Sequence, residues 1–577
     1  MKVKLLLLIL LHFALLTGLY SQTYSVNDSL ALLAIDSSCD LLDSLNWNTE
    51  PDPGLWEGIT WDTSIPKRVK MIDISWKSLS GRLFINDIPL LTNLDCSGNS
   101  NLLLDSLDRS TLTDLYCMYN ELSFLNLSKL TDLEYLNCSW NNINIIDVSG
   151  LINLEYLICN GNNLTHLDIS NNINLAYFDC SGNSLDSLDL SSISKLISIE
   201  CQFNNITILD VSNQPDLIWL NCAGNYLISL DIAGLPNLQH LDCSDNQLST
   251  INLSGLSQLN ELYCFANQLI ELDVSSLTWL NYFACSYNEL NELDVSMLPN
   301  LLLLECGDNL LTTLKLGYHP LLLLLNCPNN ELSEIDLSGV DSLWTLDCSK
   351  NNFSDLNISE LIALQSLSFA DNDLTEIDIS THDNLLAMDC RRNKLTFTSL
   401  AQGLGLNYFN YNPQKIIYEP TWHNIDITID YSSEAIITGT ATQFSFYKDE
   451  ENVETNSTGF YNTEGMGVYH CEMTNALFPG LTLTTAPVTI VPLGVEEESL
   501  KEIEIYPNPV TDILHINLPQ NDIISQIGIY SSDGKELLLF ENTYSQFEIN
   551  LSDFRTGIYI LKVTTSELSF KEQIVKY

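Results

Sequence analysis

Basic residues are scarce in this chain. Its 577 residues include 23 Lys or Arg against 74 Asp or Glu, which gives a formal net charge of −51. Binding to a nucleic acid requires a basic surface, so this balance argues against a nucleic-acid partner and against docking on anionic membranes. It favours solubility and partners that are cationic, neutral or bridged by a metal.

Long apolar runs are missing after the N-terminus. There, Lys2 and Lys4 precede an apolar stretch from Leu5 to Leu16, the pattern of a secretory signal peptide, which we assign to residues 1–21. A membrane anchor is the alternative, but the stretch is shorter than the roughly 20 residues that span a bilayer. We therefore expect export and no transmembrane segment in the mature chain.

Motifs for catalysis are missing as well. The eight histidines are scattered, and none lies in a nucleophile or metal-binding pattern. Carboxylates are abundant, but their regular spacing is typical of a scaffold and not of a tuned acid and base. We predict that the protein is not an enzyme and holds no cofactor.

Cysteine is rare outside one register. Steps of 21 residues from Cys96 to Cys390 give 15 positions, of which 14 are cysteine and one is Phe369. Only Cys39 and Cys471 of the 16 cysteines lie elsewhere. We call these 15 positions the cysteine register. An asparagine follows each of them by three residues, within the consensus L-x-x-L-x-C-x-x-N-x-L-x-x-L-D-[LVI]-S.

Alternation within each repeat predicts strands. In YLNCS, Leu136 and Cys138 point to one side, while Tyr135, Asn137 and Ser139 point to the other. One such strand cannot bury its apolar side alone, so stacked copies predict a parallel sheet over a continuous core. The segments LDIS and LDVS also alternate and predict a second strand column on the opposite wall. The repeated asparagine amide is expected to bond backbone groups where the chain leaves the strand.

These repeats resemble the leucine-rich repeat family in its short 21-residue bacterial form. The resemblance implies a solenoid, which we place at residues 91–412. Residues 23–90 are similar to the N-terminal cap of plant-type leucine-rich repeat receptors, including Trp47, Trp56 and Trp61. Such caps usually carry a paired-cysteine motif, of which only Cys39 is present here.

The register cysteines have three interpretations. Buried free thiols are the simplest, because free cysteine behaves as a small hydrophobe. A disulfide ladder is the second, although Cβ vectors on neighbouring parallel strands point the same way, which suits an S–S bond poorly. A metal–thiolate stack is the third, but the C-x-x-C clustering of zinc sites is absent. We predict that most register thiols are free.

The outward positions of the first strand predict a surface rich in aromatic and acidic residues. Such a surface is typical of recognition sites and fits a protein or glycan ligand. The alternative is that neighbouring rings only pack on one another to cover the sheet. The candidate ligand-binding residues are Tyr135, Tyr156, Tyr177, Trp219, Tyr263 and Tyr282.

An aspartate column follows the second leucine of the repeat. Like charges one strand apart repel, so serine hydrogen bonds, solvent or bound cations must offset them. Calcium takes oxygen ligands of this kind, although one outward column supplies few ligands per ion. Asp168, Asp189 and Asp210 are weak calcium candidates.

Residues 414–492 resemble an immunoglobulin-like domain. In GVYHCEMTNA, Tyr469 stands two residues before Cys471, as in a tyrosine corner. No partner cysteine is visible, so we expect no core disulfide. Most such domains are spacers or binding modules.

Residues 503–577 closely resemble the type A C-terminal sorting domain of the type IX secretion system. The resemblance implies a small β-sandwich, engagement of the type IX secretion machinery, and a location that is secreted or on the outer-membrane surface of a Gram-negative bacterium. The matching motif residues are Tyr506, Pro507, Asn508, Pro509, Gly557, Tyr559 and Lys562.

The predicted fold is therefore mainly β: a leucine-rich repeat solenoid, an immunoglobulin-like β domain and a small β-sandwich sorting domain. The predicted function is protein or glycan binding, in adhesion or recognition, by a secreted or cell-surface protein. The alternative is a structural surface-layer or matrix component without a specific ligand.

Overall fold

The computed structural model describes residues 23–39, 45–47, 49–104, 107, 111–423, 426–490 and, with gaps, 504–576. The predicted signal peptide, residues 1–21, lies outside these ranges. The chain divides into two units. The first unit comprises Met1–Pro420, Ile429–Tyr461 and His470–Pro487. The second unit comprises Thr421–Thr428, Asn462–Tyr469 and Val488–Tyr577.

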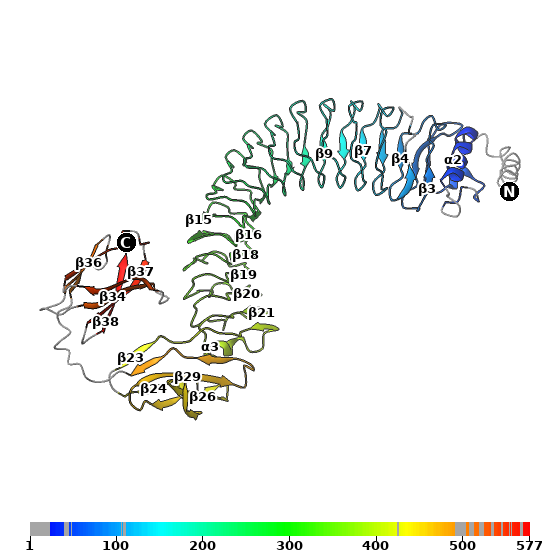
Figure 1. Ribbon diagram of the computed structural model, residues 1–577. Helices are drawn as coiled ribbons and strands as arrows, with labels where there is room; N and C mark the ends of the chain where they lie inside the picture. Colours follow the sequence, from blue (N-terminus) through cyan, green and yellow to red (C-terminus); the bar gives the residue numbers. More distant parts are fainter. Residues whose placement is uncertain are drawn as a thin grey trace. The chain divides into compact units, whose positions relative to one another are not determined.

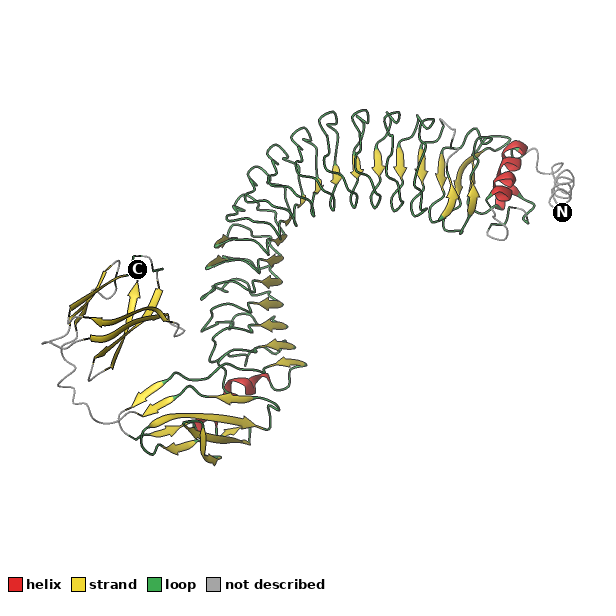
Figure 2. Cartoon of the chain, viewed as in Figure 1, coloured by secondary structure: helices red, strands yellow, loops and turns green. Residues whose placement is uncertain are grey.

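A solenoid with one short strand per coil makes up most of the first unit (Figure 1). Neighbouring strands are parallel and in register, so that Tyr135, Tyr156 and Tyr177 lie side by side. Figure 2 shows these strands along the inner side of the row of coils. The parallel strands are β2 (Val69–Asp73), β4 (Asn93–Asp95), β6 (Asp114–Tyr116), β7 (Tyr135–Asn137), β8 (Tyr156–Ile158), β9 (Tyr177–Asp179), β10 (Ser198–Glu200), β11 (Trp219–Asn221), β12 (His240–Asp242), β13 (Glu261–Tyr263), β14 (Tyr282–Ala284), β16 (Leu303–Glu305), β18 (Leu324–Asn326), β19 (Thr345–Asp347), β20 (Ser366–Ser368), β21 (Ala387–Asp389) and β22 (Tyr408–Asn410).

The interior of the solenoid is built from leucines and thiols. The middle residue of each strand and the register cysteine after it point inward, as at Leu136 and Cys138, both fully buried. All 16 cysteines are buried and free, which confirms the prediction of free thiols. Burial raises the pKa of every register thiol, for example to about 12 at Cys138, Cys201 and Cys306.

The register asparagines tie each coil to its neighbour. Asn204 Nδ2 donates to the carbonyls of Cys180 (3.0 Å) and Cys201 (3.1 Å), and its Oδ1 accepts from Leu185 N–H (3.0 Å). The same pattern recurs along the column, for instance at Asn246. The amide thus satisfies backbone groups of two coils at once, as the sequence predicted.

The second strand column is largely absent, so that prediction was wrong for most coils. Strand pairs form on this wall only as β3 (Ser80–Arg82) with β5 (Asn101–Leu103) and β15 (Glu292–Asp294) with β17 (Thr313–Lys315), within the described residues. Asp147 Oδ1 accepts from Ser149 N–H (3.0 Å), which turns the chain directly after the aspartate. The same bond follows β15, between Asp294 and Ser296 (3.1 Å), so the turn limits the length of the extended segment on this wall and does not by itself exclude a strand.

A helix and a hairpin close the N-terminal end of the solenoid. Helix α2 (Val26–Ser38) begins at the N-cap Ser25, and η1 (Pro53–Leu55) precedes β1 (Ile59–Trp61), which pairs antiparallel with β2. Asp28 is fully buried and accepts from Arg68 Nη2 at 2.8 Å. Cys39 is buried with a free thiol, as expected from the missing partner cysteine.

The other end of the solenoid is covered by residues of the following β region. The Phe397 ring in α3 (Phe397–Leu400) stacks on Phe478, with 5.4 Å between centroids, and Glu434 accepts from Thr398 N–H at 2.9 Å. The remaining elements before residue 491 are η2 (Ala401–Gly403), β23 (Thr421–His423), β24 (Thr428–Asp430), η3 (Ser432–Glu434), β25 (Ile436–Ile437), β26 (Thr440–Lys448), β27 (Glu451–Asn456), β28 (Phe460–Asn462), β29 (Gly467–Asn475), β30 (Thr482–Thr484) and β31 (Val488–Ile490).

Two antiparallel sheets form the C-terminal part of the second unit. One contains β32 (Glu504–Tyr506), β33 (Ile513–Asn517) and β36 (Gln546–Asn550). The other contains β34 (Ile524–Ser531), β35 (Glu536–Thr543), β37 (Gly557–Thr565) and β38 (Ser569–Lys576). Buried side chains of both sheets, such as Ile516 and Leu561, share one core. The motif residues Pro507, Asn508 and Pro509 lie outside the described residues.

We expect Asn204→Ala to lower the free energy of unfolding by about 2–5 kcal/mol, because it leaves buried backbone groups of two coils without partners. The exposed Asn171, with one 3.3 Å bond to Ser149, is the matched control, and its alanine variant should change stability by less than about 0.5 kcal/mol. Urea denaturation measures both. Equal effects of the two substitutions would contradict a special role of the buried column.

We also expect stability to fall steeply in alkaline solution. The thiol pKa is raised from an ordinary value of 9.0 to about 12 at Cys201, so the unfolded chain ionises this thiol at a pH where the folded chain cannot. The contribution of the un-ionised Cys201 thiol to the free energy of unfolding is complete below pH 9.0, and it is lost as the pH rises through the thiol pKa of the folded chain. Each such thiol lowers the free energy of unfolding by about 1.4 kcal/mol per pH unit in this window.

The measurement is the urea midpoint under reducing conditions from about pH 8 to about pH 11, a range that crosses the ordinary thiol pKa of 9.0 and stays below the folded value of about 12 at Cys201. The triple variant Cys201→Val, Cys222→Val and Cys243→Val should show a shallower slope than the parent. Identical slopes would overturn the assignment of this dependence to the buried thiols.

Candidate functional site

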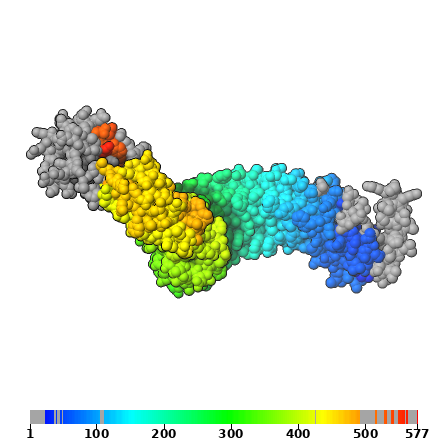
Figure 3. Space-filling view, turned by 90° about the horizontal axis from the view of Figure 1, so that it is seen from below, coloured from blue at the N-terminus to red at the C-terminus, as the bar shows by residue number. Residues whose placement is uncertain are grey.

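The outward surface of the parallel sheet, which we call the strand face, carries the six predicted ligand-binding residues. The middle residue of each strand points inward, so the first and third residues point outward. Tyr135, Tyr156, Tyr177, Trp219 and Tyr282 each begin a strand, and Tyr263 ends one. The structure therefore brings all six candidates onto one surface, and Figure 3 shows their coils as one packed body.

Neighbouring rings on the strand face pack against each other. Tyr116, Tyr135, Tyr156 and Tyr177 form a continuous stack with 4.7, 5.3 and 4.6 Å between successive centroids. The packing alternative drawn from the sequence is thus present in the structure. It does not cover every ring, because Tyr177, Trp219 and Tyr282 are each 37% exposed.

A second aromatic cluster surrounds His240. Its ring stacks on Trp219 with 3.5 Å between centroids, and Tyr263 lies 5.6 Å away. His240 Nδ1 lies 2.8 Å from Glu261 Oε2, and only 7% of the residue is exposed. His240 begins β12 and so stands at an outward position, but Trp219 and Glu261 on the neighbouring strands cover it.

Carboxylates occupy the third strand position next to these rings. Asp179 and Glu200 are neighbours in register on β9 and β10. Burial raises the pKa of Asp179, and the nearby Glu200 adds to the effect, while hydrogen bonds from Ser181 oppose it. In the described parts of the chain, no Lys or Arg forms an ion pair with either carboxylate.

A row of exposed aromatic residues lies at the turn after the strands, and we call Trp76, Tyr119 and Trp140 the rim aromatics. The centroid of the Tyr119 ring lies 5.6 Å from that of Trp76 and 5.7 Å from that of Trp140. The rings of Tyr119 and Trp140 are parallel within 3°. All three are exposed, by 43–62%. None of the three is among the candidate residues taken from the sequence, although Tyr119 and Trp140 each stand two residues after a register cysteine.

Backbone conformation sets the rim aromatics in place. Tyr119 and Trp140 adopt left-handed φ values of 56° and 52°, which coil-to-coil bonds such as Trp140 N–H to Asn160 O (2.8 Å) hold. Glycine at the same position of the next coil leaves room for a ring. A Cβ on Gly161 would lie 3.0 Å from the Trp140 ring, and one on Gly98 would lie 2.4 Å from Trp76.

The aspartate column has a local structural role. Asp168, Asp189 and Asp210 each accept from the N–H of the serine two residues later, at 2.9–3.0 Å. Asn126 and Asn252 accept the same bond in their own coils, at 3.2 and 3.1 Å. An oxygen acceptor is therefore what this position requires, and a negative charge is not.

No metal centre is evident from geometry in the described residues, where no group of three or more His, Cys, Asp or Glu side chains is arranged to hold an ion. Calcium binding by Asp168, Asp189 and Asp210 stays a prediction. A calcium-dependent rise in melting temperature that the three Asp→Asn substitutions abolish would support it.

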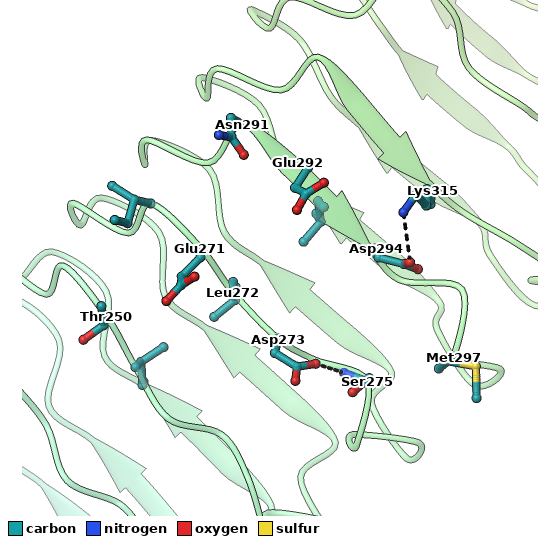
Figure 4. A pocket seen from close by; sticks show the side chains of 13 residues that line it. Thr250, Glu271, Leu272, Asp273, Ser275, Asn291, Glu292, Asp294, Met297 and Lys315 are labelled. Carbon is teal, nitrogen blue, oxygen red and sulfur yellow. Dashed lines mark hydrogen bonds and ion pairs between the residues drawn. The ribbon is translucent and has the colours of Figure 1, made fainter.

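An open groove of about 790 Å³ lies on the wall with the aspartate column (Figure 4). Asp273 and Asp294 line it, together with Glu271, Glu292 and Lys315. Asp273 accepts from Ser275 N–H at 2.9 Å, and Lys315 Nζ lies 3.6 Å from Asp294 Oδ2. Asp273 is thus engaged in a turn and Asp294 in an ion pair, so these two carboxylates of the groove have a structural role.

We expect Asp210→Ala to lower the melting temperature, because Ser212 N–H loses its acceptor, and Asp210→Asn to lower it less at neutral pH, because the amide oxygen still accepts this bond without the charge. Hydrogen bonds lower the pKa of Asp210 from 3.8, so its stabilisation is present above that pH and is lost as the pH falls through the lower folded value. The asparagine variant should lack this dependence. Thermal denaturation at neutral and acid pH measures both, and equal losses in the two variants at neutral pH would show that the charge matters.

Comparison with solved structures shows one relative of the same family. The functional domain of InlJ from Listeria monocytogenes, described as including a cysteine ladder, is 30% identical to this chain. The match covers 72% of this chain and 90% of that one, with a TM-score of 0.62. YopM from Yersinia enterocolitica is 23% identical over 59% of this chain and 88% of its own, with a TM-score of 0.41. No curated protein sequence matches the chain.

A family model for the secretion system C-terminal sorting domain matches residues 504–577. This match agrees with the two antiparallel sheets of that region, and it means that the protein is secreted or attached to the outer-membrane surface. None of the helices in the described ranges has the length and apolar character that crossing a bilayer requires. The chain belongs to the bacterial leucine-rich repeat proteins and carries a type IX secretion system C-terminal sorting domain.

Proposed function

We propose that the strand face of the solenoid binds a protein, and that the chain acts in recognition or adhesion outside the cell. Tyr177, Trp219 and Tyr282 carry this proposal, because they are exposed aromatic side chains on a hydrogen-bonded sheet. Aromatic residues are enriched in protein interfaces and in their hot spots. A rigid scaffold also loses little conformational entropy when it binds.

Charge supports the same proposal. The chain carries a net charge of −51, and the carboxylates Asp179, Glu200 and Asp242 lie on the strand face beside the rings. Such a surface attracts a basic partner and speeds its association. The leucine-rich repeat solenoid is in general a binding scaffold, which agrees with the prediction that the protein is not an enzyme.

The other parts of the chain fit an exported binding protein. We assign residues 414–492 to an immunoglobulin-like domain, because Tyr469 Oη donates to the Gly465 carbonyl at 2.8 Å, as in a tyrosine corner. We assign residues 503–577 to a β-sandwich, because two sheets share one core there. Residues 1–21 stay a predicted signal peptide.

A glycan is the second candidate ligand, and the rim aromatics favour it. Trp76 and Trp140 are 62% and 54% exposed on a backbone that coil-to-coil bonds hold in place. Flat aromatic faces of this kind stack on sugar rings. The two candidate surfaces are separate columns of the solenoid, so substitutions distinguish them.

The test is a binding screen of the exported chain against extracellular protein and glycan arrays. We expect the double variant Tyr177→Ala and Trp219→Ala to lose at least about 2 kcal/mol, or roughly 30-fold, in affinity for a protein partner. The control variant Trp76→Ala and Trp140→Ala should keep that affinity. Unchanged protein binding by the first variant would overturn the proposal. Concentration-dependent self-association without any ligand would instead support a structural surface-layer or matrix component.

A further inference from the structure

One strand interrupts the aromatic column of the strand face. Strands β9, β10 and β11 begin with Tyr177, Ser198 and Trp219, which are paired in register. Serine is therefore the short residue between two exposed rings. This arrangement leaves a slot above Ser198 with an aromatic ring on either side.

The two rings turn one face each toward this slot. Tyr177 stacks on Tyr156 on its far side, with parallel planes 4.6 Å apart between centroids, and Trp219 stacks on His240 on its own far side. Strand spacing places the Cα atoms of Tyr177 and Trp219 about 10 Å apart. A planar group in contact with two rings needs about 7–8 Å, so the slot admits one side chain.

Acceptors without cationic partners lie at the end of the slot. Asp179 and Glu200 form the third positions of β9 and β10, and Ser181 Oγ donates to Asp179 Oδ1 at 2.6 Å and fixes its orientation. Gln202 Nε2 donates to Glu200 Oε2 at 3.2 Å, while Gln202 Oε1 is buried without a hydrogen-bond donor. Two neighbouring carboxylates call for a group that is positive and has several donors.

We propose that this slot receives an arginine side chain of the partner protein, held between Tyr177 and Trp219 and bonded to Asp179 and Glu200. A guanidinium is planar, stacks on aromatic faces and presents five N–H donors, which matches both the rings and the acceptors. Lysine offers a compact charge without a planar face and fits less well. The inference rests on the proposed protein-binding function and names the chemistry of the partner.

The raised pKa of Asp179 agrees with this occupant. Burial and the neighbouring Glu200 both oppose its ionisation in the free protein. A guanidinium in the slot would offset the repulsion between the two carboxylates.

The chain supplies substitutions that suit its own fold. Leucine stands at the position of Ser198 on β16 and β18, as Leu303 and Leu324, so Ser198→Leu fills the slot with a residue that the column accepts. Asparagine stands at the position of Asp179 on β7 and β11, as Asn137 and Asn221, so Asp179→Asn keeps the local turn.

Matched controls lie farther along the same columns. Thr345→Leu and Asp347→Asn on β19 introduce the same two residues at equivalent strand positions away from the slot. Asp347 Oδ1 accepts from Ser349 N–H at 2.9 Å, as Asp179 does from Ser181. If binding depends on the slot, Ser198→Leu and Asp179→Asn must weaken it, whereas the two control variants on β19 must not.

The experiment titrates the full exported chain with a fluorescent Gly–Ser peptide that carries arginines, and with its lysine and citrulline counterparts, at physiological salt. We expect the arginine peptide to bind at least about tenfold tighter than either counterpart. Ser198→Leu and Asp179→Asn should remove this preference, while Thr345→Leu and Asp347→Asn should retain it. Equal losses in Asp179→Asn and Asp347→Asn would reduce the binding to general charge attraction and overturn the proposal.

Failure of the arginine slot can be distinguished from failure of the proposed protein-binding function. A protein partner whose binding depends on Tyr177 and Trp219 but is unchanged by Ser198→Leu would overturn the arginine slot and leave the function intact. Arginine-selective binding at the slot by a chain whose protein partners ignore Tyr177→Ala and Trp219→Ala would leave the slot intact and overturn the function.

Discussion

The hydrogen bond between an asparagine amide and the backbone of two successive coils is the interaction on which the rest of this structure depends. Asn204 bonds to its own coil at Cys201 and to the preceding coil at Cys180 and Leu185. Repetition of this bond keeps the coils in the same register. From β4 onward, a strand residue lies beside the residue 21 positions away, as on β9, β10 and β11. Columns of side chains on the solenoid surface are the direct consequence.

Columns turn small differences between repeats into local surface chemistry. Tyr135, Tyr156 and Tyr177 follow one another on successive strands, and their rings stack on each other. A serine stands between Tyr177 and Trp219, so one face of each of these two rings has no aromatic neighbour. The thiol column has the opposite character, because it is uniform and wholly inside. A small apolar side chain at that position lets each coil approach the next, while variation is confined to the outward positions where a partner can contact it.

Sequence reasoning succeeded where the structure follows from the repeat alone and failed where side chains of different coils compete. Buried thiols and the asparagine bonds followed from the period and from the chemistry of those residues. In the described residues the second strand column is confined to the pairs β3–β5 and β15–β17, because a turn at Asp147 and its equivalents keeps the extended segment on this wall short. His240 is buried for a reason that no single repeat contains: Trp219 and Glu261 come from the coils on either side of it.

The sequence by itself determined the coil, its inward thiols and leucines, and the export domain at residues 504–577, because each of these depends on a pattern that is local or strictly periodic. Only the tertiary structure decided which outward residues are available to a partner. Tyr156 and Tyr177 occupy the same position of the repeat, yet only Tyr177 has a serine beside it on the next strand. Exposure on such a surface is set by residues 21 positions before and after, and it exists only once the coils are stacked.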